Sequence, residues 1–90
     1  MNGSFDEESL SPEEEERMTI EDDLEMLRED LIGELQAINQ YQEHIESLES
    51  EEALTTLEHI IEEEKEHVAE LLRLIRNLDP VQAEKFKEIL

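Results

Sequence analysis

The sequence contains no cysteine among its 90 residues, which excludes a disulfide and any thiolate ligand for a metal ion. This absence suits a reducing compartment, and we expect the cytoplasm. A chain of this length forms one small domain that buries little apolar surface by itself. Because disulfides are excluded, a bound metal ion or a partner chain is the expected source of additional stability.

Long apolar runs and basic residues are also scarce. The chain has no apolar segment long enough to span a membrane and no basic start before an apolar stretch, so we predict neither a membrane helix nor a signal peptide. It has 28 acidic residues against 7 Lys and Arg, a net charge of −21. Such a chain repels nucleic acids and anionic membranes, so we expect neither as a partner. Most of the carboxylates are typical of a solvated surface.

The acidic residues 1–18 show no apolar period, and we predict a mobile tail in which Glu13–Met18 forms at most a fraying turn. Residues 19–90 are predicted to be the folded domain. Thr19, followed by Asp22, resembles a capping box at the start of a helix of about 28 residues, or roughly 42 Å. Gly33 is the only helix-weakening residue within it.

Two more helices are predicted after a short break. Ser50 is a suitable N-cap for a second long helix that ends near Asn77. Asp79 then caps a short third helix that begins at Pro80. The predicted fold is all-α, an antiparallel two-helix hairpin with a short C-terminal helix. Because two helices bury only one seam, we expect half of a four-helix bundle that a second copy completes.

The apolar positions of the two long helices follow alternating steps of four and three residues, the spacing of a packed seam. These positions form one stripe along each helix, and polar residues interrupt both stripes near the middle. In an antiparallel hairpin the two interruptions therefore lie at a similar level along the helices. The first stripe contains Leu27, Leu31, Glu34, Ile38, Tyr41, Ile45 and Leu48, and the second contains Ala53, Leu57, Ile60, Glu64, His67, Leu71, Leu74 and Leu78.

Burial of Glu34 and Glu64 is unfavourable without a positive partner, and no Lys or Arg lies on either stripe. A bound cation compensates both carboxylates. Glu64 and His67 are three residues apart, so both side chains reach one ion from one helix face. Carboxylate and imidazole together suit iron, manganese or zinc. The Glu-x-x-His spacing is weak evidence in a glutamate-rich helix, and the alternative is a polar break that sets coiled-coil register.

Two copies would contribute four carboxylates and two histidines from Glu34, Glu64 and His67, which is the ligand set of ferritin-like di-iron bundles. Tyr41 is predicted to hydrogen-bond a ligand carboxylate or to pack with its hydroxyl toward water. His44 and His59 lie off the stripes, and we expect solvated or rim positions for them.

The segments "GELQAINQYQEHI" and "IIEEEKEHVAELLRLIRNLDP" resemble the encapsulated ferritin-like proteins, relatives of rubrerythrin and ferritin that are encapsulin cargo or fused to the shell. The resemblance implies that Glu34, Glu64 and His67 are the ferroxidase ligands, that Tyr41 lies beside them, and that two subunits share two iron ions. It also implies dimers arranged in annular decamers and a location inside an encapsulin nanocompartment, whose shell stores the oxidised iron.

The sequence departs from this family at the positions of an outer metal site. Some members have carboxylates there, whereas this chain has Gly33 and Gln36, with Asp30 as a nearby substitute, and Gln40 replaces a tryptophan. A cargo-loading tail normally follows the family's domain, so we expect further chain beyond Leu90, removed by truncation or processing or belonging to a fusion.

The function that we predict is Fe(II) oxidation at a di-iron site between two subunits. Two alternatives are a rubrerythrin-like protein that reduces peroxide and a non-catalytic helical oligomerisation module in which the polar seam residues specify pairing.

Overall fold

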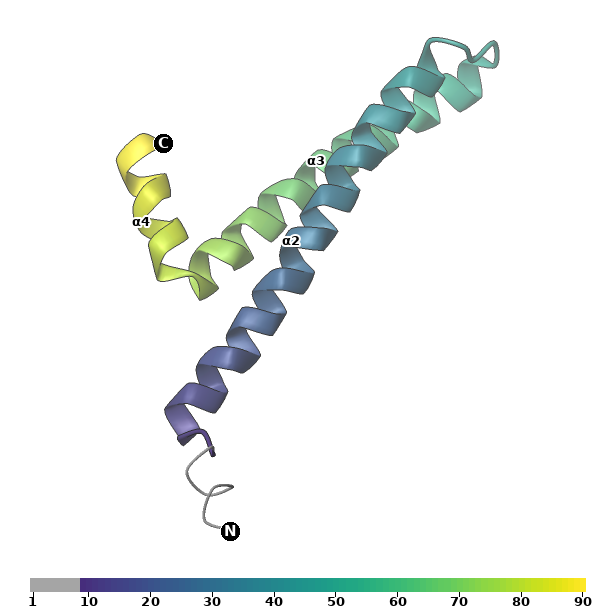
Figure 1. Ribbon diagram of the computed structural model, residues 1–90. Coiled ribbons are helices and arrows are strands. Elements are labelled where there is room, and N and C mark those ends of the chain that lie inside the picture. Colours follow the sequence, from purple (N-terminus) through teal and green to yellow (C-terminus); the bar gives the residue numbers. More distant parts are fainter. Residues whose placement is uncertain (1–8) are drawn as a thin grey trace.

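A computed structural model describes residues 9–90, which form helices without any strand (Figure 1). The helices are α2 (Pro12–Ile45), α3 (Glu51–Leu78) and α4 (Pro80–Ile89). Helices α2 and α3 pack side by side as an antiparallel hairpin, and α4 turns away at the end of α3. The predicted all-α fold with a short C-terminal helix is therefore confirmed. Residues 1–8 of the predicted tail lie outside the described residues.

The predicted start of the first helix at Thr19 is wrong, because α2 begins at Pro12 and runs across that position for 34 residues, about 51 Å. The Ser11 hydroxyl oxygen accepts a hydrogen bond from the Glu14 backbone N–H at 3.2 Å. Proline at the first helical position and three glutamates in the first turn further favour this start. The prediction required an apolar stripe, but these first turns pack against nothing and form without one.

The other two predicted helix starts are confirmed. The Ser50 hydroxyl accepts from the Ala53 N–H at 3.2 Å, which caps α3. Asp79 Oδ1 accepts from the N–H groups of Val81 and Gln82, both at 3.1 Å, which caps α4. The short connection before Ser50 requires α3 to return along α2.

Asp79 has a second role that the sequence did not indicate. Its Oδ2 accepts a hydrogen bond from Arg28 Nη2 of α2 at 3.0 Å, in an ion pair between residues that are 51 positions apart. The same carboxylate therefore caps α4 with one oxygen and ties the junction of α3 and α4 to α2 with the other.

Asp79→Ala is expected to lower the free energy of unfolding by about 1–2 kcal/mol, because both the cap and the ion pair are lost. Asp79→Asn should lose less than about 1 kcal/mol, since asparagine is a good N-cap and only the charge is removed. Urea denaturation followed by circular dichroism measures both changes. Lys85→Ala is the control, because its ion pair with Glu88 is exposed. Equal losses in the Ala and Asn variants would contradict the capping role.

The hairpin buries few side chains. Among the described residues, only three apolar side chains are buried, those of Leu24, Ile61 and Ile75, and each keeps 4–5% of its surface exposed. The radius of gyration is 20.2 Å, against about 12 Å for a compact domain of this length. The smallest dimension, 14 Å, is close to the thickness of one layer of helices. One face of the seam therefore lacks a covering layer, as expected for half of a bundle.

No helix within residues 9–90 combines the length and the apolar character that a membrane crossing requires.

Candidate metal centre

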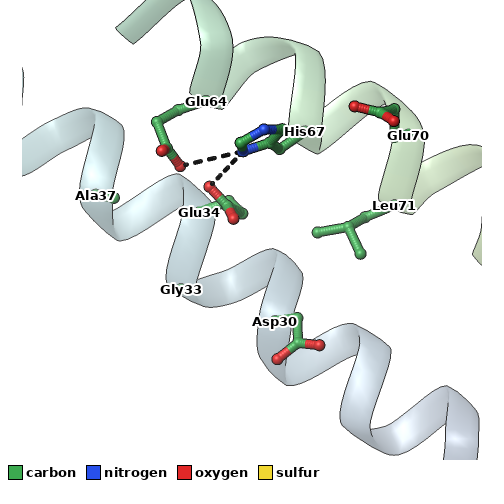
Figure 2. A pocket seen from close by; sticks show the side chains of 8 residues that line it. All are labelled: Asp30, Gly33, Glu34, Ala37, Glu64, His67, Glu70 and Leu71. Atoms are coloured by element: carbon green, nitrogen blue, oxygen red, sulfur yellow. Dashed lines mark ion pairs between the residues drawn. The ribbon is translucent and has the colours of Figure 1, made fainter. Parts of the chain in front are cut away.

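Glu34 lies in the second half of α2, and Glu64 and His67 lie near the middle of α3. Figure 2 shows how the three side chains face one another. The antiparallel hairpin brings these positions to the same level, as the seam pattern predicts. His67 Nδ1 is 3.7 Å from Glu34 Oε2 and 3.9 Å from Glu64 Oε2. One ligand atom from each residue lies within 4.8 Å of the other two. The three side chains thus converge on one point between the helices.

The spacing of these atoms fits a shared ion better than direct hydrogen bonds. Both His67 distances exceed 3.5 Å, beyond the range of a hydrogen bond. Two atoms that bind one metal ion at about 2.0–2.2 Å lie about 3–4 Å apart. The observed separations are therefore close to those of ligands around a metal ion.

The strongest indication of a missing positive charge is Glu34 Oε2. This oxygen is buried and has no hydrogen-bond partner, although a buried carboxylate oxygen without one is strongly unfavourable. In the part of the chain that the structure describes, no Lys or Arg forms an ion pair with Glu34 or Glu64. A cation among the three side chains would satisfy this oxygen.

The donor set is open on one side. The side chains of Glu34 and Glu64 are 27% and 18% exposed, whereas the side chain of His67 is 48% exposed. Two carboxylates and one imidazole suit iron, manganese or zinc, but they leave coordination positions for further ligands.

The three side chains line a pocket of about 480 Å³ that extends along the hairpin (Figure 2). Asp30 and Gly33 on α2 and Glu70 on α3 line the same pocket. The sequence reasoning named Asp30 but missed Glu70, although Glu70 follows His67 by the same three-residue step that separates His67 from Glu64. A Cβ atom at Gly33 would meet nothing within 4 Å, so the pocket is open at this position.

The structure does not bring Tyr41 into this pocket. Tyr41 is half-buried and lies two helical turns beyond Glu34, about 10 Å along α2. Its predicted place beside the ligands remains a proposal that depends on a second copy. His44 and His59 are exposed and lie outside the pocket, and His59 pairs with Glu63 at 3.4 Å.

Comparison with known proteins gives consistent results over most of the chain. The chain is 44% identical over 62 residues to the encapsulin nanocompartment cargo protein EncC of Myxococcus xanthus, covering 69% of this chain and 48% of EncC. It is 41% identical over 69 residues to the ferritin-like-encapsulin shell fusion protein of Pyrococcus furiosus, covering 77% of this chain and 20% of that protein. Cargo protein EncB of Myxococcus xanthus is 35% identical over 65 residues, covering 72% and 41%.

The chain therefore spans at most about half the length of these relatives. No solved structure gives a significant match. The model of the EncFtn-like family matches residues 9–90, the whole described range and both helices that carry the candidate ligands. This match confirms the resemblance on which the sequence prediction depended. The chain belongs to the EncFtn-like family.

Proposed function

We propose that the protein is a ferroxidase that oxidises Fe(II) to Fe(III) at a di-iron site shared by two copies of the chain. The observation that carries the proposal is the convergence of Glu34, Glu64 and His67 around a buried carboxylate oxygen that has no hydrogen-bond partner. Iron is the substrate. Each Fe(II) loses one electron, so two ions with two protons reduce one O₂ to H₂O₂, or one H₂O₂ to two H₂O.

A second copy is required by the composition of the site. One chain offers two carboxylates and one imidazole on an open face, whereas ferritin-like di-iron sites use four carboxylates and two histidines. Pairing two hairpins through the uncovered seam supplies that set and adds the missing helical layer. In this arrangement Glu34, Glu64 and His67 of each copy would hold the irons: Glu64 would be shared by the two ions, Glu34 would chelate, and His67 would give each iron one nitrogen. Tyr41 lies beside the ligands and helps to orient them.

The protein contributes ligand geometry and local charge to the reaction. Carboxylates favour Fe(III) over Fe(II) because the additional positive charge is better compensated, and the open coordination positions admit the oxidant. The pocket is open at Gly33, which leaves a route for ions and oxidant to the ligands. The chain's strongly negative charge raises the local concentration of Fe(II).

We further propose that the protein acts with an encapsulin shell, inside the nanocompartment that the shell encloses. Two of its relatives are named as nanocompartment cargo, and the third combines a ferritin-like part with an encapsulin shell part in one chain. In this arrangement the chain oxidises the iron and the shell retains the product.

Aerobic addition of Fe(II) tests the ferroxidase proposal. We expect the protein to accelerate formation of Fe(III), followed by near-ultraviolet absorbance, until one Fe(II) per chain has reacted, because two copies share two ions. His59→Ala is the matched control, since His59 is exposed and lies outside the pocket. A rate equal to that of buffer would reject the proposal, and peroxide consumption with an added electron donor would favour the rubrerythrin-like alternative.

A further inference from the structure

A second concave surface lies between α3 and α4, away from the candidate metal centre. It is a groove of about 580 Å³, which is within the usual size range of sites for small molecules. The residues that α3 contributes lie between positions 69 and 76, so the groove follows this helix for about 10 Å. Its apolar floor consists of Ala69 and Leu72 of α3, Ala83 and Phe86 of α4, and Leu90. The groove therefore has the dimensions of a site for one small organic molecule.

Three cations border this groove, Arg73 and Arg76 on α3 and Lys87 on α4. The sequence contains 7 Lys and Arg residues, and within residues 9–90 only Arg28 and Lys85 form ion pairs with carboxylates. Three of the other five cations thus line one groove, although the chain has 28 acidic residues to offer. Their positive charges are available to an anionic ligand.

The charge around the groove differs from that of the rest of the chain. Residues 65–90 contain five basic and five acidic residues, whereas residues 1–64 contain 23 acidic and two basic ones and account for the whole net charge of −21. Salt at physiological concentration screens exposed charges that are more than about 8 Å away. An anion in the groove is therefore attracted by the adjacent cations and largely screened from the distant carboxylates.

The cations favour a phosphate group as the charged part of the ligand. Arginine binds phosphate oxygens through two parallel hydrogen bonds, and a phosphomonoester carries nearly two negative charges at pH 7. Arg73 and Arg76 are three residues apart and lie next to each other on one side of α3, so both can reach one phosphate. Lys87 supplies a third positive charge from α4.

The floor of the groove favours an aromatic ring as the uncharged part. Phe86 is half-buried, so part of its ring is accessible to a second ring that stacks on it. Arginine guanidinium groups also stack on aromatic rings. Ala69 and Ala83 each contribute only a methyl group, one from each helix, which leaves space beside Phe86.

We propose that this groove binds a phosphomonoester that carries a flat aromatic ring, the chemistry of a mononucleotide. The ring stacks on Phe86 over the apolar floor, and the phosphate binds Arg73, Arg76 and Lys87. A nucleic acid strand does not fit this site, because it would extend beyond the groove and meet the acidic surface of the chain.

The site is separate from the candidate metal centre. The groove residues of α3 lie on the face of the helix opposite to Glu64 and His67, and the two pockets share no lining residue. Binding in the groove therefore requires no metal ion and does not depend on the proposed ferroxidase function.

Titration of the full chain with flavin mononucleotide, with a chelator present, tests the proposal through the quenching of flavin fluorescence. We expect saturable binding of one molecule per chain. Riboflavin lacks the phosphate and inorganic phosphate lacks the ring, so each should bind at least about tenfold more weakly. Adenosine monophosphate, followed by calorimetry, distinguishes the two sources of this chemistry, since the tighter of the two mononucleotides identifies the preferred ring.

Substitutions in the groove locate the binding. Arg73→Gln combined with Arg76→Gln should weaken the binding of flavin mononucleotide at least about tenfold, because the charge-assisted hydrogen bonds to the phosphate are lost. Lys65→Gln combined with Lys85→Gln is the matched control, since it removes two positive charges at exposed positions outside the groove. Phe86→Leu should also weaken binding, with helix content unchanged by circular dichroism.

Two results would overturn the proposal directly: no saturable binding of either mononucleotide, or wild-type affinity in the double arginine variant. If neither mononucleotide binds and the double arginine variant has a lower molar mass by analytical ultracentrifugation, another copy of the chain covers the groove, and the proposal is equally overturned. Because the titrations contain no iron, the ferroxidase proposal holds or fails on iron oxidation alone.

Discussion

Glu64→Ala is expected to reduce the initial rate of aerobic Fe(II) oxidation at least about a hundredfold, to nearly the rate in buffer. Loss of residues that merely orient metal ligands commonly reduces activity by 10- to 100-fold, and the loss of a bridging ligand should exceed that range. In a pair of copies the substitution removes both bridges at once. Stopped-flow measurement of Fe(III) formation at equal protein and iron concentrations gives the rate.

Glu63→Ala is the matched control for this experiment. Glu63 neighbours Glu64 on α3 and is exposed, so the substitution makes the same change in charge and side-chain size outside the pocket. Its rate should stay close to that of the wild type. If Glu64→Ala retained the wild-type rate while its circular dichroism spectrum was unchanged, the candidate ligands would not carry the oxidation.

Replacement of both Glu34 and Glu64 by leucine is expected to stabilise the metal-free protein by about 1–4 kcal/mol. The two carboxylates interrupt an apolar seam and one of their oxygens is buried without a hydrogen-bond partner, so well-packed leucines remove an unfavourable charge. The same variant should lose its response to metal. The wild-type protein should gain about 2.7 kcal/mol at Fe(II) concentrations one hundred times the dissociation constant, measured without oxygen.

Comparing the double-leucine variant with the wild type distinguishes a metal site from polar residues that set the register of helix pairing. A leucine variant that is less stable than the wild type without metal would show that the polar residues serve pairing, as the oligomerisation alternative holds. Equal stabilisation of both proteins by Fe(II) would place the bound ion elsewhere. Glu63→Leu with Glu66→Leu is the control, since both glutamates are exposed and their replacement should give no comparable gain.

Most of the fold and the convergence of the three candidate ligands could be predicted because they depend on local rules. A helical period places Glu64 and His67 on one face regardless of what surrounds them. The short break before Ser50 imposes an antiparallel return, which brings Glu34 to the same level. The caps at Ser50 and Asp79 follow from side chains that act within three residues of themselves.

The start of α2 shows where this reasoning failed. An apolar stripe was used as the sign of a helix, whereas Ser11, Pro12 and the following glutamates are sufficient without one. The stripe marks where a helix packs, and the caps mark where it begins. In α2 these two positions differ, and the difference produces the projecting turns that carry Met18.

The sequence alone determined the antiparallel hairpin, its seam and the candidate ligands, since each depends on spacing along one or two segments. Tertiary structure decided which groups remain without a partner. Glu34 Oε2 is buried without a hydrogen-bond partner, and Arg28 reaches Asp79 because the junction of α3 and α4 lies beside it. Arg73, Arg76 and Lys87 surround one groove because α4 turns away from the hairpin. Such placements depend on the angles between helices. These angles arise from packing between distant segments, so the periodic pattern of the sequence does not indicate them.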